Sequence, residues 1–420
     1  MRRAVNSRFG AMTKRKRNTV VAAMTVFLTA IAAFCLVRQP TPATMTPAAV
    51  PPYQEPPTLI ETEPRLATAR QALENKDYIA ALRFTEAAEK QGTPVPALEA
   101  MRAAIFRETD YLDREMEACQ RWGAAAPEDA EPWLKLFYIY SDMAWKREAD
   151  WASKEALKRA PGNARTHVAR ALFLEQNARM NDALAELAEA QRLNNGNPAT
   201  VSNIRATFLL RAGRYKEAET EIRNAVARDP SQVNHRIVLA QALFNQERHD
   251  AAAILFREIQ EQEPENVEAA FQLGVIAEQQ GNVNEATRQM ERAAGIDAQY
   301  GTVIWNLTQL YRRQGRVAES KMLARLYGKM NKSTSAFDSK VSQVHSRPGD
   351  LKLHWHLATN YLSSGEYPKA IVELRAIQHF APKDELVLQA LHIALTKAGR
   401  VTEADVLKKT MKAAAGSKKK

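Results

Sequence analysis

The sequence predicts an all-helical protein, an α-solenoid of stacked helix pairs that follows one apolar segment near the N-terminus. Three observations predict this fold class. Prolines recur at a spacing of 34 residues, near-copies of one short motif surround five glycines, and nineteen consecutive residues (19–37) carry no charge. A fixed period of this length is the signature of a repeat architecture in which each unit buries its apolar face against its neighbours. The prolines are spaced from Pro127 to Pro161, from Pro230 to Pro264 and from Pro348 to Pro382.

Composition supports a folded protein and argues against nucleic-acid binding. The 420 residues are 45% hydrophobic and 25% charged, which is the balance of globular proteins. The net charge is +11, but residues 1–38 carry +8 and residues 400–420 carry +5, which leaves −2 for residues 39–399. A surface that follows phosphates needs its positive charge in the folded body. We therefore expect no nucleic-acid partner.

The apolar segment from Thr19 to Val37 is long enough to span a bilayer as a helix. Four basic residues precede it (14–17) and a single arginine follows it, so the positive-inside rule places residues 1–18 in the cytoplasm. This predicts a single-pass protein of the bacterial inner membrane with its repeats in the periplasm. Residues 38–60 are rich in proline and form an extended linker.

Two other interpretations of this segment stay open. Ala30-Ile31-Ala32 has the small residues that a signal peptidase prefers, so cleavage near Ala32 would give a secreted protein. The apolar run continues to Val37, which favours a retained anchor. A mitochondrial anchor would instead leave the repeats in the cytosol. The two cysteines, Cys35 and Cys119, provide no disulfide framework.

The glycine motifs mark the turn between two helices. They are GRYKEA (213–218), GNVNEA (281–286), GRVAES (315–320), GEYPKA (365–370) and GRVTEA (399–404). In each motif a glycine ends one helix, and a small residue five positions later lies in the next helix. Leucine followed by a small residue recurs in the preceding helix, as at Leu273-Gly274 and Leu357-Ala358.

These residues resemble the tetratricopeptide repeat (TPR), which is a pair of antiparallel helices. The resemblance covers about residues 60–418 and implies a right-handed superhelix. It divides the chain into about eight repeats (61–334), an inserted segment (335–350), about two further repeats (351–414) and a basic tail (415–420). The insertion is expected to form an extra short helix or a hinge. Arg170 and Arg205 replace the usual leucine and are expected to direct their guanidinium groups outward.

The resemblance also implies a protein or peptide partner, bound on the inner surface that the first helices of the repeats line. Aromatic residues accumulate toward the C-terminal end of this row. The alternative that these side chains pack against neighbouring helices stays open for Trp305 and Trp355 and is favoured for Ile237 and Phe271. The predicted peptide-binding residues are Ile237, Phe271, Trp305, Gln309, Arg312, Lys352, Trp355 and Asn360.

The sequence predicts no enzyme, cofactor or metal site. It has no phosphate-binding loop, no HExxH and no CxxC motif, and His354 and His356 point to different faces of one helix. The predicted function is a membrane-anchored scaffold or adaptor for an envelope, secretion or polysaccharide-export complex. The alternative is a periplasmic or cytosol-facing chaperone or receptor that holds unfolded or targeting peptides. Oligomerisation through an end of the solenoid stays open.

Overall fold

The computed structural model describes residues 59–193, 195, 197–346 and 350–417. The predicted cytoplasmic segment 1–18, the predicted anchor 19–37 and nearly all of the linker lie outside this range. Within the described residues, no helix combines the length and the apolar character that crossing a bilayer requires.

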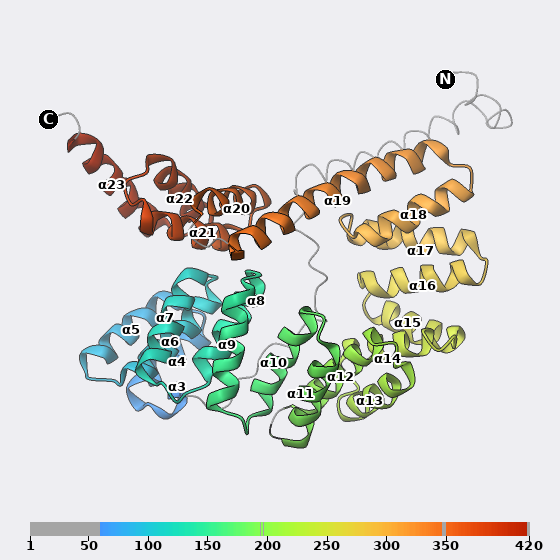
Figure 1. Cartoon of the computed structure of the whole chain (residues 1–420), viewed down its shortest axis with the longest axis horizontal. Helices are drawn as coiled ribbons and strands as arrows, with labels where there is room; N and C mark the ends of the chain where they lie inside the picture. The colour runs from blue at the N-terminus through green and yellow to red at the C-terminus, as the bar shows by residue number, and fades with distance from the viewer. Residues whose placement is uncertain (1–58, 194, 196, 347–349, 418–420) are drawn as a thin grey trace. The chain divides into compact units, whose positions relative to one another are not determined.

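The described residues form helices joined by short turns, and no strand occurs among them. A short helix α3 (Leu59–Thr62) and a 3-10 turn η1 (Pro64–Leu66) come first, and helix pairs follow (Figure 1). The first helices of the pairs are α4 (Ala67–Glu74), α6 (Val95–Glu108), α8 (Glu131–Asp142), α10 (Ala164–Gln176), α12 (Pro198–Arg211), α14 (Val233–Phe244), α16 (Val267–Gln279), α18 (Gly301–Arg313), α20 (Leu351–Ser364) and α22 (Glu385–Lys397). The second helices are α5 (Tyr78–Lys90), α7 (Leu112–Ala125), α9 (Lys146–Arg159), α11 (Met180–Leu193), α13 (Tyr215–Arg228), α15 (His249–Gln262), α17 (Val283–Ile296), α19 (Val317–Ser346), α21 (Tyr367–Phe380) and α23 (Val401–Ser417).

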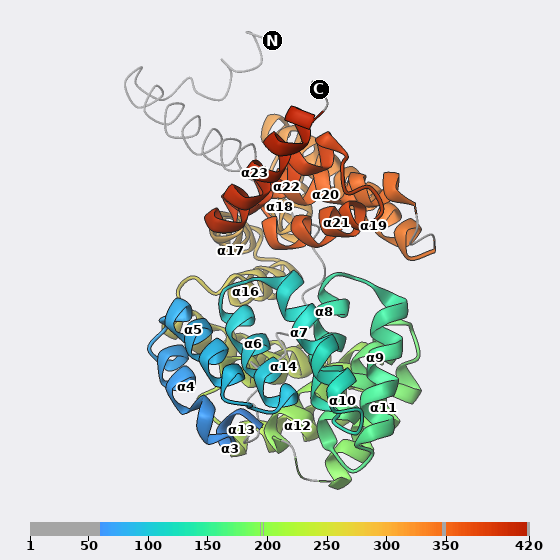
Figure 2. The same ribbon diagram turned by 90° about the vertical axis from the view of Figure 1, so that its left-hand side faces the viewer.

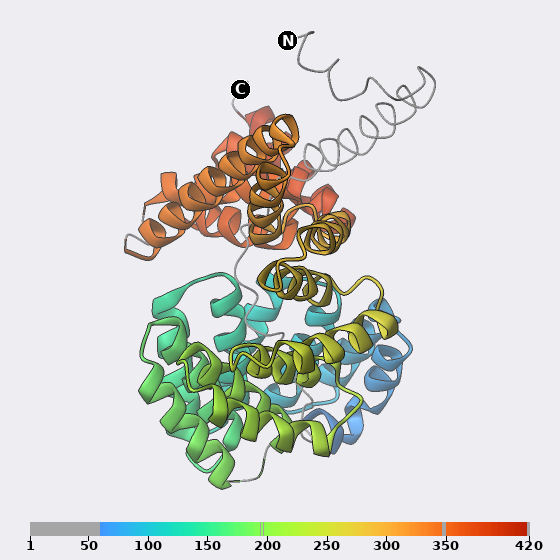
Figure 3. The same ribbon diagram turned by 90° about the vertical axis from the view of Figure 1, so that its right-hand side faces the viewer.

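The helices form two compact units. The middle unit contains Phe256–Ser335, and the terminal unit contains the described residues up to Leu255 together with those from Ala336 onward. Each boundary falls inside a helix, α15 or α19. Figure 2 shows the successive pairs α4 to α11 of the terminal unit, and Figure 3 shows the yellow to orange helices of the middle unit stacked in sequence order. The prediction of an all-helical solenoid is confirmed.

The turns inside the pairs need a left-handed backbone conformation. Gly213, Gly281, Gly315, Gly365 and Gly399 have φ between 70° and 83°, as the motif predicts. Five pairs use another residue at the equivalent place, with φ between 54° and 63°: Lys76, Asp110, Ala144, Ala178 and Glu247. A side chain at this φ is disfavoured by roughly 1 kcal/mol, so packing of the flanking helices must maintain these five turns.

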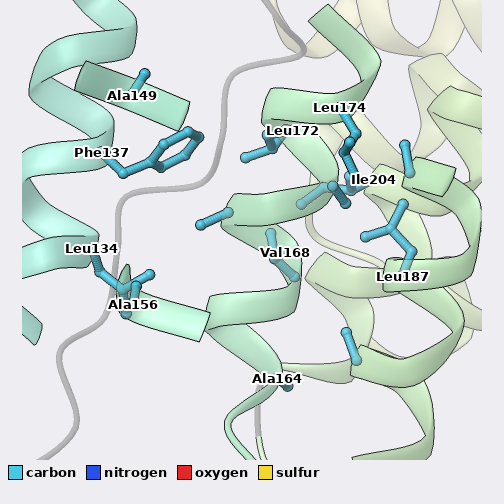
Figure 4. Packing of buried hydrophobic residues seen from close by; sticks show 14 of the residues in the cluster. Leu134, Phe137, Ala149, Ala156, Ala164, Val168, Leu172, Leu174, Leu187 and Ile204 are labelled. Carbon is cyan, nitrogen blue, oxygen red and sulfur yellow. The ribbon is translucent and has the colours of Figure 1, made fainter. Parts of the chain in front are cut away.

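Small residues let the helices of a pair approach closely. Ala183, Ala218 and Ala286 are fully buried. At Gly274, a Cβ would lie 3.0 Å from the Cε of Met290, so the leucine–glycine pair of this repeat depends on the missing side chain. Figure 4 shows how the buried leucines, among them Leu187 and Leu172, fill the space between neighbouring pairs in the terminal unit.

The two arginines that replace leucine do not point outward. Arg170 is buried, and its guanidinium lies 2.6 Å from the carboxylate of Asp150 and 3.2 Å from the hydroxyl of Ser153, both on α9. Arg205 is partly buried and donates to Glu221 on α13 and, at 2.8 Å, to Gln191 on α11. The expectation was wrong because an acid on an adjacent second helix supplies a partner within the helix interface.

The inserted segment does not form a separate short helix. Helix α19 continues through its residues as far as Ser346, for a length of 30 residues. The sequence from 335 to 346 contains neither glycine nor proline, so nothing in the backbone ends the second helix of the eighth repeat earlier.

Leu187→Ala is expected to lower the free energy of unfolding by about 2–5 kcal/mol, because it leaves a cavity at a fully buried position of α11. Ile254→Ala is the control, since Ile254 is 54% exposed and its loss should change stability by less than about 1 kcal/mol. Chemical denaturation followed by circular dichroism measures both. Equal effects of the two substitutions would contradict the packing described here.

Candidate protein-interaction surface

The first helices of the middle unit carry a half-exposed tryptophan. The Trp305 side chain on α18 is 47% exposed, and its ring centroid lies 5.3 Å from that of Tyr327 on α19. Gln309 is partly exposed and Arg312 is exposed. Residues at i, i+4 and i+7 share one side of a helix, so an indole, an amide and a guanidinium follow one another along α18.

Phe271 packs rather than projecting into solvent. Its ring is partly buried against the core of the middle unit and lies 5.5 Å from the ring of Tyr300. The hydroxyl of Tyr300 donates to the carboxylate of Glu268 at 3.1 Å, and burial beside this carboxylate raises the pKa of Tyr300. A salt bridge of 2.6 Å between Glu278 and Arg313 also joins α16 to α18.

The other four predicted residues belong to the terminal unit. Ile237 on α14 is partly buried, and Trp355 on α20 is partly buried against the core of the last two repeats. Lys352 is exposed one turn before Trp355, on the same side of α20. Asn360 follows Trp355 by five residues and therefore lies on another side of the helix. The eight residues thus divide equally between the units, and a single continuous row stays a prediction.

Opposite charges one repeat apart join the first helices, and this feature escaped the sequence analysis. Arg165 binds Glu131 through two hydrogen bonds of 2.5 and 3.1 Å, and Arg211 lies 2.5 Å from Glu175. Burial lowers the pKa of Arg165 to about 10, so the group remains cationic at neutral pH. The sequence does contain a signal for these contacts: opposite charges separated by about one repeat, as at Glu131 and Arg165.

Two further features of the terminal unit were also missed. Asn203 on α12 is buried, and its Oδ1 has no hydrogen-bond partner within the described part of the chain. On α22, Leu386 and Ile393 are 66% and 53% exposed and share one side of the helix. Leu386 and Ile393 lie beyond Trp355, the last tryptophan of the row, where the aromatic pattern no longer guides the choice of residues.

The described residues contain no group of three or more side chains that fits a metal ion. His354 is buried, and its ring Nδ1 lies 2.6 Å from Glu373 of α21, whereas His356 is exposed. A shallow, open depression of about 510 Å³ lies between the α12–α13 turn and the end of α14, and its lining includes Arg214, Lys216 and Gln246. Nothing in the described residues shows catalysis.

Comparison with known proteins agrees with the repeat pattern. The tetratricopeptide repeat family model matches residues 205–263 and 255–300, which span α12 to α17. This match supports the interpretation of the helix pairs as tetratricopeptide repeats. No curated protein sequence matches the chain.

Among solved structures, the chain is similar to YrrB, described as a TPR protein with an unusual peptide-binding site, at 19% identity and a TM-score of 0.37. The alignment covers 45% of this chain and 97% of YrrB. It is also similar to TTC0263, a thermophilic TPR protein of Thermus thermophilus, at 18% identity and a TM-score of 0.34, covering 47% and 99% of the two chains. PilF of Pseudomonas aeruginosa matches at 18% identity and a TM-score of 0.40, covering 55% of this chain and 97% of that protein.

The two tryptophans of the row are expected to differ in their effect on stability. Trp355→Ala should lower the free energy of unfolding by about 2–4 kcal/mol, because the ring packs against a core. Trp305→Ala should cost less than about 1 kcal/mol, since the indole is half-exposed. Equilibrium denaturation of the two variants tests this order, and a larger loss for Trp305→Ala would show that this ring is structural.

Proposed function

We propose that the protein is a non-enzymatic scaffold or adaptor that binds a protein or peptide through the exposed side of α18. Tetratricopeptide-repeat proteins generally mediate protein–protein interactions and peptide binding. The observation that carries the proposal is the exposure of Trp305 beside Tyr327. Tryptophan is seldom left so exposed, and it is enriched among the residues that dominate binding energy at interfaces.

The neighbours of Trp305 suggest the chemistry of the partner. Gln309 provides an amide that both donates and accepts hydrogen bonds, as a peptide backbone requires. Arg312 provides a guanidinium that binds carboxylates with two hydrogen bonds. An apolar residue on Trp305 and an acidic residue or a C-terminal carboxylate at Arg312 would satisfy this surface. We therefore propose a partner segment that combines an apolar anchor with an acidic group.

The proposal includes the location. The uncharged segment 19–37, with its basic N-terminal flank, supports a single-pass inner-membrane anchor that leaves the repeats in the periplasm. There the scaffold would support the assembly or recruitment of an envelope, secretion or polysaccharide-export complex. Alkaline phosphatase fused to the C-terminus is expected to be active in bacterial cells and to sediment with the membranes. An inactive fusion would contradict the periplasmic orientation, and a soluble active fusion would indicate cleavage near Ala32.

Crosslinking of the full chain in native membranes, followed by purification, tests the binding surface. Trp305→Ala and Arg312→Glu are each expected to reduce recovery of one dominant partner at least tenfold, because both remove a contact of the proposed surface. Trp151→Ala is the matched control. Trp151 is also 47% exposed, but it lies on the second helix α9 of the terminal unit.

The outcomes separate the candidate functions. One partner that is lost in the α18 variants and kept in Trp151→Ala supports the adaptor. One partner that all variants retain moves the site away from α18. Many weak partners would favour the alternative function, a chaperone or receptor that holds unfolded or targeting peptides.

A further inference from the structure

Two parts of the terminal unit that are far apart in the sequence contact each other. Asp113 of α7 and Arg400, immediately before α23, are 287 residues apart and form two hydrogen bonds, of 2.5 and 3.1 Å. Both side chains are buried; that of Arg400 is 1% exposed. Helix α7 also packs against α21, and the helices concerned are labelled in Figure 2. Repeats two and three (α6 to α9) therefore contact repeats nine and ten (α20 to α23).

The ion pair is part of a charged network. Glu403 of α23 lies 2.8 Å from Arg400, 2.9 Å from Arg375 of α21 and 3.2 Å from Arg114 of α7. The guanidinium carbon of Arg400 lies 4.4 Å from the ring centroid of Tyr111. Cations and acids alternate across the contact, so each buried charge has an opposite neighbour. At its margin, Lys369 of α21 lies 3.0 Å from Asp142.

A small apolar cluster accompanies the charges. Met143, in the turn between α8 and α9, is buried against side chains of α20 and α21. Trp145 and residues of α7 pack around its edge. The buried members of the cluster are Met143, Leu357, Tyr361, Ala370 and Val372.

Each side of the contact has a core of its own. The helices up to α7 bury one apolar cluster, and those from α8 to α13 bury most of another. The last two repeats bury a third, which includes Ile371, Leu391 and Leu395. In a solenoid each repeat is stabilised by its immediate neighbours. Each side therefore has an apolar core that is separate from the long-range contact.

We propose that this contact is a releasable latch, formed by Asp113, Arg114 and Met143 on one side and Tyr361, Arg375, Arg400 and Glu403 on the other. The latched state fixes repeats nine and ten on repeats two and three, and the open state frees both surfaces. Two observations support release: the interface is rich in charge, as inter-domain interfaces that move are, and each side has a separate apolar core. Desolvation of the paired charges offsets much of their attraction, so the ion pairs by themselves favour the latched state only weakly.

Release would expose a surface of defined chemistry. On repeats two and three, Asp113 and Asp142 lie beside apolar side chains of α7 and the α8–α9 turn. A partner helix that presents arginine or lysine next to leucine or tyrosine would match this surface. The last two repeats of the chain present the same residue types to it. Such a partner shifts the equilibrium by its preference for the open state.

A distance measurement on the full chain in detergent tests the latch. Spin labels at Ala124→Cys on α7 and Val406→Cys on α23, both exposed positions, report the separation after Cys35 and Cys119 are replaced by alanine. The spin-labelled protein with its wild-type charges is expected to show two distances between the labels, a short one for the latched state and a long one for the open state. Arg400→Asp and Asp113→Arg should each raise the ratio of the long-distance to the short-distance population at least tenfold, because each places like charges next to one another in the network.

Two further variants keep the test decisive if a buried reversal unfolds the protein. Lys369→Glu breaks the ion pair with Asp142 at the margin of the contact. The Asp142 side chain is 62% exposed, so we expect the fold to tolerate the Lys369→Glu substitution. It should raise the ratio of long to short distances about two- to fivefold. Arg192→Glu on α11, which breaks an exposed pair with Glu189 outside the latch, should leave the ratio unchanged.

The proposal is overturned if Arg400→Asp and Lys369→Glu both retain the wild-type distances. It is also overturned if the wild-type charges give only the short distance at every salt concentration from low to molar, since the contact would then be static. Circular dichroism of each variant confirms that its helices are intact.

Discussion

The close approach of paired helices is the constraint on which the rest of the structure depends. Alanine or glycine lies at the crossing of most pairs, and Gly274 shows how little room remains, because a single added carbon would contact Met290 at 3.0 Å. With the helices this close, leucines from adjacent pairs fill the space between repeats. The exposed side of α18, where Trp305 lies, does not take part in this packing and forms the proposed binding surface.

This constraint explains why so much of the fold follows from the sequence. The glycine turns, the small residues and the prolines are local signals that recur at a fixed period, so each confirms the register of the next. The helix pairs could therefore be placed without a structure. Turns at Ala144 and Ala178 lack the glycine signal, but the spacing of their neighbours still located them.

Interactions that are not periodic could not be predicted. Arg170 departs from the repeat pattern, and only the structure shows that Asp150 of the previous helix binds it. Asp113 and Arg400 are 287 residues apart, and the repeat pattern contains no signal that would pair them. In the sequence, each is indistinguishable from an ordinary surface charge. Trp305 and Trp355 occupy equivalent positions, yet one is half-exposed and the other packs. The difference arises from the neighbouring side chains of each helix rather than from the repeat.

The contact between Asp113 and Arg400 also has a consequence for how the protein is made. Translation adds roughly 5–20 residues per second, so about 15–60 s separate the synthesis of these two residues, which are 287 positions apart. Repeats two and three stack with their neighbours during that interval, while Asp113, Met143 and Trp145 remain uncovered. The nascent chain therefore presents an acidic and apolar surface to its surroundings until the last repeats emerge. The contact can form only after the last repeats have emerged, so it closes late in folding.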